Sequence, residues 1–358
     1  MSGSSGPRRA AVIGTGLIGG SIGLALRAQG WFVTGRDRNE AMQARALELG
    51  AFDALGHDPD AELTFVATPV GSIAEQVAEA LATTRGLVTD VGSVKAPMLE
   101  LMADPRYVGG HPMAGSELEG VDGARAELFE GAMWVLTPIT GTDDDAYRDI
   151  HAVVSSFGAE VIAIPPQRHD SMVAMVSHVP HLTAATLMGL ADERSVEHRA
   201  LLRLAAGGFR DMTRIAAGHP GIWPDICTEN RDAIVDELDS LIEALRGVRD
   251  IVADGNREAL VEVLDQARSA RIALPARFSR PEDLVEIRIP VADRAGVLAP
   301  IVSLAAEVDV SIFDIEIAHS SEGPQGVLIL VVEGGAGEAL RSVLVDHGYS
   351  PSSLRALE

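Results

Sequence analysis

The feature that most constrains this chain is a glycine-rich turn, GTGLIG at residues 14–19, placed between two apolar runs. The first run, 10–13, leads into the turn, and helical spacing follows it. A second β-like run, 31–35, ends just before Asp37. Strand, glycine turn, helix, strand and acid are, in this order, the parts of a dinucleotide-binding βαβ unit. Asp37 lies where a carboxylate binds the adenosine ribose hydroxyls.

Each glycine of the turn has a separate physical role. Gly14 permits the tight turn, Gly16 lets the backbone approach a pyrophosphate, and Gly19 lets the helix pack closely on the strand. The free N–H groups at the helix start, beginning at Leu17 and Ile18, are then expected to meet the phosphates.

A targeting segment is the main alternative for this stretch. Residues 10–26 carry no charge and follow Arg8 and Arg9. The stretch is shorter than the ~20 apolar residues that a membrane-spanning helix needs. Glycines interrupt it, and no small-residue cleavage site follows. The nucleotide-binding interpretation is therefore favoured.

Length, charge and cysteine content limit the classes of protein. With 358 residues, the chain is long enough for two or three domains. Its net charge of -23 argues against nucleic acid or an anionic membrane as a partner. The single cysteine, Cys227, excludes an internal disulfide and a CxxC metal site. A reducing cytoplasm is the expected location.

Strands and helices continue to alternate up to residue 165. Further strands are predicted at 63–67, 87–91, 107–108, 133–136 and 161–164, with helices at 70–81 and from Gly92. We therefore expect residues 7–165 to form an α/β domain with a doubly wound, largely parallel sheet of the Rossmann type. Ligands of such sheets lie beyond the carboxyl ends of the strands, where Thr68, Ser93 and His111 are expected to meet.

Residues 166–275 are predicted to form an all-α domain. One apolar seam steps by four and three residues, which indicates a helix packed lengthwise on a partner. The seam consists of Ile234, Leu238, Leu241, Leu245, Val248 and Val252. An intramolecular bundle gives the same pattern, but the long helical segment 258–272 beside it favours a dimer interface. Residues 275–283 are expected to be a linker.

Residues 283–358 are predicted to form a compact terminal domain. The expected elements are a strand at 284–291, a turn at 293–296, a helix at 297–307, strands at 310–317 and 327–332 around a turn at 320–325, a helix at 336–347 and a strand at 349–354. This β-α-β-β-α-β order is that of a ferredoxin-like fold. No catalytic cluster stands out in it.

His111 is the leading catalytic candidate. Glycines on both sides of it let substrate and backbone come close, and Pro112 fixes the chain direction. A histidine can accept a proton from an alcohol at neutral pH, which suits the oxidation of a carbinol by hydride transfer. The alternative is a hydrogen-bonded structural histidine. Ser93 is expected to orient this imidazole or to touch the nicotinamide, and it can also cap the helix after Gly92.

Other polar residues have weaker signals. His178 and His181 lie three apart, and because no third ligand is spaced nearby, substrate contact or a hydrogen-bonded interdomain histidine is favoured over zinc. Arg214 suits a carboxylate, and Asp211 is placed to hold it, although a surface ion pair gives the same spacing. His169 and Lys95 are expected to be solvated, or in the case of Lys95 to cap a helix.

Five segments together resemble the prephenate dehydrogenase family of the tyrosine pathway, in that family's order and across nearly the whole chain. The matching segments are 14–21, 90–95 (DVGSVK), 110–115 (GHPMAG), 177–181 (SHVPH) and 208–214 (GFRDMTR), with Trp223 beyond. The terminal unit resembles an ACT domain, an amino-acid-sensing module that some members of the family carry.

The resemblance implies a role for each site residue. His111 would be the catalytic hydrogen-bond partner of the substrate's ring hydroxyl, and Ser93 would orient it beside the nicotinamide. Arg214 would bind a substrate carboxylate, with Asp211 holding it. Four further residues would line the substrate pocket: His181, Ser177, Ser116 and Glu117.

The resemblance also implies a nicotinamide cofactor. The residues that would bind it are Gly14, Gly16, Leu17, Ile18, Gly19, Asp37, Arg38 and Thr68. NAD is expected. Arg38 is a cation that favours a 2′-phosphate, so NADP stays open.

The implied activity is NAD-dependent oxidative decarboxylation of prephenate to 4-hydroxyphenylpyruvate, by a cytoplasmic homodimer with tyrosine as an effector at the terminal unit. No metal is needed, because the developing aromatic ring takes up the electrons. Arogenate differs from prephenate at a remote side chain, and the sequence does not decide between them. The rival interpretations are another hydroxyacid dehydrogenase with an ACT-like domain and a non-catalytic sensor.

Overall fold

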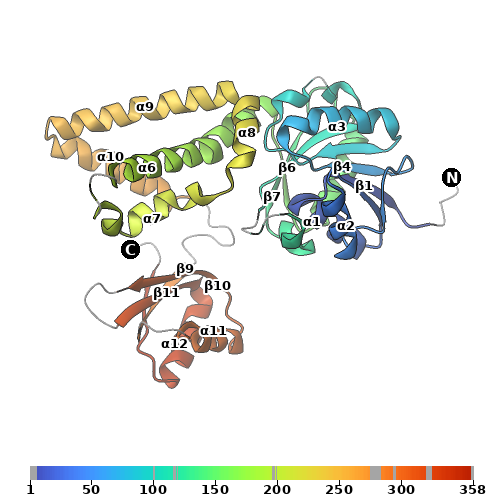
Figure 1. Cartoon of the computed structure of the whole chain (residues 1–358). Helices are drawn as coiled ribbons and strands as arrows, with labels where there is room; N and C mark the ends of the chain where they lie inside the picture. Colours follow the sequence, from blue (N-terminus) through green and yellow to red (C-terminus); the bar gives the residue numbers. More distant parts are fainter. Residues whose placement is uncertain are drawn as a thin grey trace. The chain divides into compact units, whose positions relative to one another are not determined.

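The computed structural model describes residues 6–99, 101–115, 118, 120–195, 198, 200–274, 284–292, 296–319 and 325–355. The chain divides into two compact units, Met1–Arg246 and Gly247–Glu358. Each unit is described by itself below (Figure 1).

An eight-stranded sheet forms the centre of the first unit, in the order β3-β2-β1-β4-β5-β6-β7-β8. Its strands are β1 (Arg9–Ile13), β2 (Phe32–Arg36), β3 (Ala54–Leu55), β4 (Leu63–Val66), β5 (Leu87–Asp90), β6 (Tyr107–Pro112), β7 (Met133–Thr137) and β8 (Glu160–Ala163). The pairings from β3 through β6 are all parallel, which confirms the Rossmann-type prediction. The prediction did not include the antiparallel pairing of β6 with β7. In the described part of the connection between these two strands, the helical elements are the 3-10 turns Val121–Gly123 and Ala126–Phe129, and no α-helix of the kind that usually forms a parallel crossover occurs.

Helices cover both faces of this sheet. α1 (Leu17–Ala28), α2 (Glu40–Glu48) and α4 (Asp144–Ser155) contribute to one apolar core, and α3 (Val70–Thr83) contributes to the other. Successive strand residues point to opposite faces, so Phe65 of β4 packs into the first core and Val66 into the second.

The chain that follows β8 is helical, and within the described residues 169–274 no strand occurs, as predicted. The helices are α5 (Pro166–Val173), α6 (Val179–Ser195), α7 (Gly207–Thr213), α8 (Trp223–Glu229) and α9 (Arg231–Ala253), with α10 (Arg257–Ile272) in the second unit. One π-helical turn, Ala174–His178, joins α5 to α6. A small core tethers these helices to the loop after β5: Val94, Ala174, Ile226 and Ile234.

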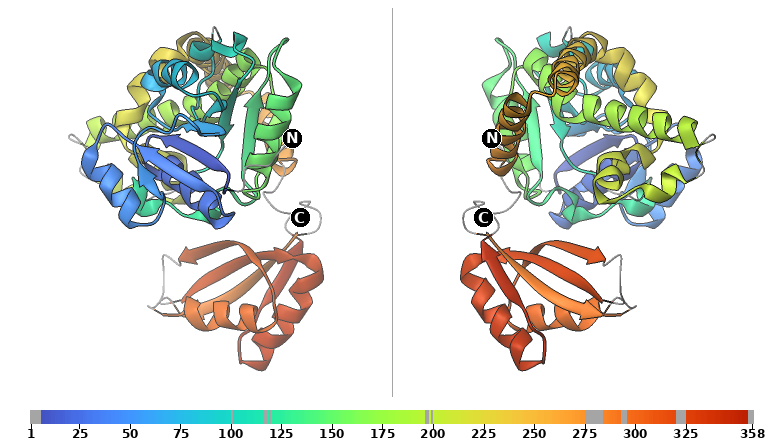
Figure 2. Two further views of the ribbon diagram at one scale, coloured as in Figure 1. Left: turned by 90° about the vertical axis from the view of Figure 1, so that its right-hand side faces the viewer. Right: turned by 90° about the vertical axis from the view of Figure 1, so that its left-hand side faces the viewer.

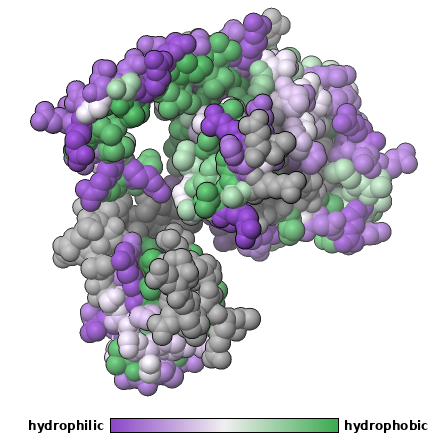
Figure 3. All heavy atoms as spheres, turned by 60° about the vertical axis from the view of Figure 1, so that its left-hand side comes forward, coloured by the Kyte–Doolittle hydropathy of each residue, from purple (hydrophilic) through white to green (hydrophobic). Residues whose placement is uncertain are grey.

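Much of the apolar surface of these helices faces solvent. Figure 3 shows apolar side chains gathered along the flank of the long helices. Residues such as Met175, Val176, Leu204 and Met212 are 55–79% exposed. The run Pro166–Ser195 is long and apolar enough to cross a membrane by length and composition, which is weak evidence, and it contains the buried, hydrogen-bonded side chains of His169 and Asp170.

The part of the second unit from residue 284 onward has the predicted β-α-β-β-α-β order. Its elements are β9 (Leu284–Ala292), α11 (Leu298–Glu307), β10 (Ile312–His319), β11 (Gln325–Glu333), α12 (Gly334–Asp346) and β12 (Ser352–Arg355). The strands pair antiparallel in the order β10-β11-β9-β12. Figure 2 shows both helices on one face of this sheet, over a buried core that includes Ile289, Ile301 and Leu340. The predicted linker 275–283 and the turn residues 293–295 and 320–324 lie outside the described residues.

Candidate active site

The glycine turn has the geometry of a dinucleotide-binding loop. Gly14 has φ +97°, and a Cβ there would lie 2.4 Å from the carbonyl oxygen of Ala67 on the neighbouring strand's end. A Cβ on Gly19 would lie 1.9 Å from the carbonyl oxygen of Gly14. A Cβ on Gly16, in contrast, would meet nothing within 4 Å. The turn is therefore tightly packed below and open at the N-terminus of α1, where backbone N–H groups bind phosphates.

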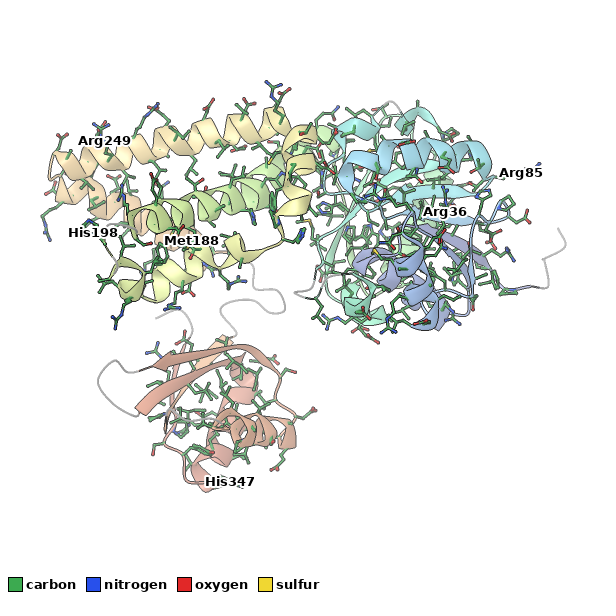
Figure 4. The ribbon with its side chains drawn as sticks, in the orientation of Figure 1. Arg36, Arg85, Met188, His198, Arg249 and His347 are labelled. Carbon is green, nitrogen blue, oxygen red and sulfur yellow. The ribbon has the colours of Figure 1, made fainter. Side chains whose placement is uncertain are left out.

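Asp37 lies directly beside this turn. Its Oδ2 accepts hydrogen bonds from the Thr15 backbone N–H at 2.8 Å and from the Thr15 hydroxyl at 3.3 Å, and its Oδ1 accepts from the Asn39 N–H at 2.9 Å. The Gly14 N–H donates to the carbonyl oxygen of Arg36, which is labelled in Figure 4, at 2.8 Å. These bonds fix the carboxylate at the carboxyl end of β2, which is where dinucleotide-binding folds bind the ribose. Arg38 is exposed beside it.

Thr68 follows β4 at the point where the strand order reverses from β1 to β4, the place where such sheets bind ligands. Its hydroxyl is buried and has no hydrogen-bond partner within the described residues. A buried hydroxyl without a partner is costly, so the site suits a polar ligand group. The residues present therefore fit a nicotinamide dinucleotide.

His111 lies within β6, because the strand continues to Pro112 rather than ending before the histidine as predicted. Its Nδ1 is 2.9 Å from Nε2 of His169, and the two rings meet edge to face. Nδ1 of His169 lies in turn 2.8 Å from Oδ1 of Asp170. His169 is only 1% exposed, so the prediction of a solvated side chain was wrong. Its position at the start of α5 turns it toward the sheet.

The loop after β5 is held by the same carboxylate. Oδ1 of Asp170 accepts from the Lys95 N–H at 2.8 Å, and Oδ2 accepts from the Ala96 N–H at 2.7 Å. The helix predicted from Gly92 does not form. A 3-10 turn, Ala96–Met98, begins instead after Lys95 and has no side-chain cap, so the predicted capping role of Ser93 was also wrong. Ser93 itself lies partly buried in this loop.

Lys95 was expected to be solvated or capping, but it is fully buried. Its Nζ donates to the Asp90 carboxylate and, at 2.7 Å, to the carbonyl oxygen of Gly110. The Tyr107 hydroxyl donates to the other oxygen of Asp90 at 2.7 Å. Burial lowers the pKa of Lys95 and raises the pKa of Tyr107 well above its usual range. This network locks the ends of β5 and β6 together, directly before His111.

The surroundings of His111 keep its imidazole neutral. Burial, together with the nearby His169 and Lys95, lowers the pKa of His111 well below its usual 6.5. A neutral imidazole retains one nitrogen lone pair, which can accept a hydrogen bond or a proton. The imidazole of His111 can therefore accept a hydrogen bond or a proton from a substrate hydroxyl, which is the role that the sequence predicted.

His178 and His181 have different environments. His178 is buried and lies 3.2 Å from Nδ2 of Asn230 through its Nδ1, which is the hydrogen-bonded histidine that the spacing favoured. Burial lowers the pKa of His178 to about 4. His181 is partly exposed and stacks on Trp223, with ring centroids 3.7 Å apart. Ser177 lies one residue before His178 and is partly buried.

Arg214 and Asp211 do not form the predicted ion pair within the described residues. α7 ends at Thr213, and Arg214 begins a 3-10 turn that ends at Ala217. Both charged side chains are exposed, where an ion pair gains little. Among the residues that the structure describes, Arg214 thus has no carboxylate partner. The predicted pocket residues Ser116 and Glu117 lie outside the described residues.

The sequence signals missed His169, Asp170 and Asn230 as members of this cluster. Asn230 donates through Nδ2 to the carbonyl oxygen of Asp170 at 2.9 Å, as well as to His178. One signal was available. His169 and Asp170 are adjacent polar residues at the start of an apolar helical run, and polar residues in such a run can be buried and hydrogen-bonded to each other.

A phosphate-binding turn at the switch point of a parallel sheet, with a neutral histidine on a strand of the same sheet, defines the chain as a nucleotide-dependent dehydrogenase. Residues 22–199 match the family described as "Prephenate dehydrogenase, nucleotide-binding domain", and residues 165–266 match "Prephenate dehydrogenase, dimerization domain". The chain belongs to the prephenate dehydrogenase family, which confirms the resemblance. It is an oxidoreductase.

Individual relatives agree with this assignment. A prephenate dehydrogenase of Bacillus subtilis is 33% identical over 331 residues, which cover 88% of this chain and 89% of that protein. A cyclohexadienyl dehydrogenase of Zymomonas mobilis is 34% identical over 279 residues, 74% of this chain and 95% of that protein. The solved prephenate dehydrogenase of A. aeolicus, in complex with hydroxyphenyl propionate and NAD+, has a TM-score of 0.71 and 29% identity, covering 76% of this chain and 100% of that one.

Proposed function

We propose that the chain catalyses the oxidative decarboxylation of prephenate to 4-hydroxyphenylpyruvate. NAD is the cofactor, and when bound it supplies the acceptor for the hydride. The turn at 14–19, Asp37 and Thr68 would hold it. The observation that carries the proposal is His111, a neutral imidazole fixed on β6 of the sheet whose strand ends hold the nucleotide-binding turn.

His111 acts on the ring hydroxyl of the substrate. Its free ring nitrogen accepts the hydrogen bond of the hydroxyl and stabilises the positive charge that develops at the carbinol carbon. The ring carboxylate leaves as carbon dioxide, its electron pair enters the ring, and the product keeps the hydroxyl as a phenol. Holding the ring in a reactive orientation can lower the barrier by about 7 kcal/mol.

Arg214 is proposed to hold a substrate carboxylate through two parallel hydrogen bonds, which its exposed guanidinium can form. His181, stacked on Trp223, presents a flat surface for the ring or the side chain of the substrate. Ser177, Ser116 and Glu117 are proposed to complete the substrate pocket, and Ser93 to lie beside the nicotinamide.

The test is NAD reduction, followed by absorbance, with prephenate, with arogenate and with NADP in place of NAD. We expect reduction with prephenate and NAD. His111→Asn is expected to lower turnover by at least 10²-fold while NAD binding, measured by calorimetry, is unchanged. An unchanged turnover in this variant, or reduction with arogenate alone, would contradict the proposal.

Residues 283–358 are proposed to form an ACT-type regulatory domain with tyrosine as its effector. Its support is the β-α-β-β-α-β order and the antiparallel sheet covered on one face. Tyrosine is expected to lower activity and to raise the melting temperature. If tyrosine, phenylalanine and tryptophan leave both quantities unchanged, the regulatory role fails.

A homodimer is proposed, formed by the helical part. The support is the exposed apolar surface of these helices and the match to a segment described as a dimerization domain. Leu245 and Val252 of the predicted seam are more than half exposed. Light scattering after size-exclusion chromatography is expected to give twice the chain mass of 37.7 kDa.

Three domains are proposed, at residues 7–165, 166–275 and 283–358, in a cytoplasmic protein. Limited proteolysis is expected to cut first between the second and third domains, within 275–283. A first cut at any other place would require other boundaries.

A further inference from the structure

We propose that His169 and Asp170 are positioning residues, which fix the tautomer of His111 so that its Nε2 carries the lone pair that meets the substrate hydroxyl. The proposal rests on the proposed function only for the identity of that hydroxyl. The tautomer itself follows from the hydrogen bonds of this chain.

The assignment starts at the carboxylate of Asp170. An ionised carboxylate only accepts hydrogen bonds. Nδ1 of His169, 2.8 Å from Oδ1, must therefore carry a proton. Neutral imidazole has one N–H, so Nε2 of His169 has the lone pair.

The same logic continues to the catalytic ring. Nε2 of His169 lies 2.9 Å from Nδ1 of His111. Since the first nitrogen can only accept, the second must donate, and His111 is protonated at Nδ1. Its Nε2 is then bare. The two histidines therefore donate in the same direction, His111 to His169 and His169 to the Asp170 carboxylate.

Other bonds prevent Asp170 from changing its role. Its two oxygens also accept from the backbone N–H groups of Lys95 and Ala96, at 2.8 Å and 2.7 Å. A proton on either oxygen would oppose at least one of the donors that face this carboxylate. The carboxylate is 3% exposed, so water cannot replace it readily.

The reversed arrangement leaves an unsatisfied contact. If His111 were protonated at Nε2, its Nδ1 would need a donor, and His169 would have to be protonated at Nε2. Nδ1 of His169 would then point a lone pair at a carboxylate oxygen 2.8 Å away. Two acceptors at that distance repel, whereas the inward chain satisfies all four atoms.

The relay has a consequence for the reaction. When His111 takes up charge from the ring hydroxyl, its Nδ1–H bond to His169 strengthens, and the charge of Asp170 stabilises it through the intervening ring. His169 and Asp170 do this without touching the substrate.

His178 provides an internal control, because its hydrogen bonds demand the opposite tautomer. The amide nitrogen of Asn230 donates to the carbonyl oxygen of Asp170 and lies 3.2 Å from Nδ1 of His178. Nδ1 of His178 therefore accepts, and its proton lies on Nε2. Neighbouring histidines are thus assigned to different tautomers by the same network.

The direct test is long-range ¹⁵N–¹H correlation spectroscopy of the full chain labelled at histidine, at a pH near 8 and without substrate. His111 and His169 are expected to be protonated at Nδ1, and His178 at Nε2. Their signals are assigned from single substitutions. A spectrum in which His111 is protonated at Nε2 would overturn the proposal, whatever the activity.

Variants separate orientation from mere packing. His169→Gln places an amide oxygen near the former Nε2 and keeps an acceptor for His111, whereas His169→Leu removes it. We expect His169→Leu to lower kcat about 10²-fold with KM for NAD unchanged, and His169→Gln to retain kcat within about tenfold of the wild type. His151→Gln, on α4, is the matched control and is expected to leave both constants unchanged.

Asp170→Asn tests the carboxylate at which the series of hydrogen bonds to His111 begins. Each of the two carboxylate oxygens faces a donor, so an amide nitrogen necessarily opposes one of them. Where it opposes Nδ1 of His169, both rings must switch tautomer, a change that costs about 10⁴-fold in a Ser-His-Asp triad. In that orientation we expect kcat to fall at least 10²-fold, with the His111 signal changed to the Nε2-protonated form. A fall in kcat without this spectral change would contradict the proposal.

The outcomes distinguish this proposal from the proposed function. If His111→Asn abolishes turnover but His169→Leu does not, His111 is catalytic and the positioning role is wrong. If the spectrum shows the expected tautomers but His111→Asn remains active, the relay exists and the function assigned to His111 is wrong. Circular dichroism of each variant, together with the spectrum of the unsubstituted protein, keeps the test valid if a variant fails to fold.

Discussion

The first unit builds its two groups of proposed substrate-handling residues in different ways. The first group, called here the His111 network, comprises His111, His169, Asp170, Lys95 and Asp90, and apart from the partly buried His111 its members are at most 3% exposed. The second group, called here the Arg214 segment, comprises residues 207–223. Arg214 is exposed, and the neighbouring Met212 is 62% exposed.

This difference indicates which part of the site exists before ligands bind. In the His111 network, charges and hydrogen bonds act at low dielectric and fix the geometry within one chain. In the Arg214 segment, a charge lies among apolar side chains that water still covers. Substrate or a second copy of the chain is expected to complete that segment, so its geometry depends on binding.

The largest effect on the free energy of unfolding is expected when the His111 network loses its buried cation. Lys95→Met leaves the Asp90 carboxylate buried without its cation, which costs about 3–5 kcal/mol of the free energy of unfolding. Urea denaturation measures this loss. The matched control is Arg148→Met, which removes a cation from the exposed pair with Asp145 and is expected to cost less than about 1 kcal/mol. Equal losses in the two variants would remove the contrast between buried and exposed charges.

The second effect is the response of the buried histidines to acid. In the unfolded chain histidine titrates near 6.5, but burial lowers the pKa of His178 to about 4 and that of His111 well below 6.5. Between pH 6.5 and about 4 the unfolded state therefore binds more protons, so stability falls as the pH falls.

For His178 alone the loss amounts to about 3 kcal/mol by pH 4, and none of it is expected above pH 7. Urea denaturation at pH 7.5, 5.5 and 4.5 measures the slope, and His178→Gln should reduce it. A flat profile in the unsubstituted protein would show that these rings take up protons in the folded state. The fall of kcat/KM in acid is likewise expected only below pH 6.5. The reason is that the lowered pKa of His111 keeps its imidazole neutral at pH 6.5.

The third effect belongs to the Arg214 segment. Arg214→Gln removes a charged donor from the substrate carboxylate, and we expect KM for prephenate to rise about 10–100-fold. Because Arg214 has no ion-pair partner within the described residues, the melting temperature is expected to stay within about a degree of the wild type. Arg210→Gln, on the preceding helix α7, is the matched control. A stability loss without a change in KM would make Arg214 a structural residue.

The sequence predicted the parts of this fold that local patterns encode. Apolar runs, the glycine turn and Asp37 located β1, α1 and β2, because a strand or a turn depends on a few adjacent residues. Those patterns also placed His111 at the carboxyl edge of the sheet.

The His111 network could not be predicted in this way, because its bonds join distant residues. His169 lies 58 residues from His111, and Asp170 lies 75 residues from Lys95. Periodicity reports which face of an element is apolar, but it does not report which polar residue on another element will meet it. A single lysine or histidine therefore looked solvated until the fold brought its partner close.

The smallest expected effect concerns Asp211, and it tests whether the Arg214 segment is really unpaired before binding. Since no ion pair joins Asp211 to Arg214 in the described residues, Asp211→Asn should change the free energy of unfolding by less than about 0.5 kcal/mol. If the pair forms only around a bound carboxylate, the variant raises KM for prephenate a few-fold while stability stays constant. A measurable loss of stability would show that the two side chains already interact in the free protein. The contrast with the His111 network, where the partners are in place from the start, would then no longer hold.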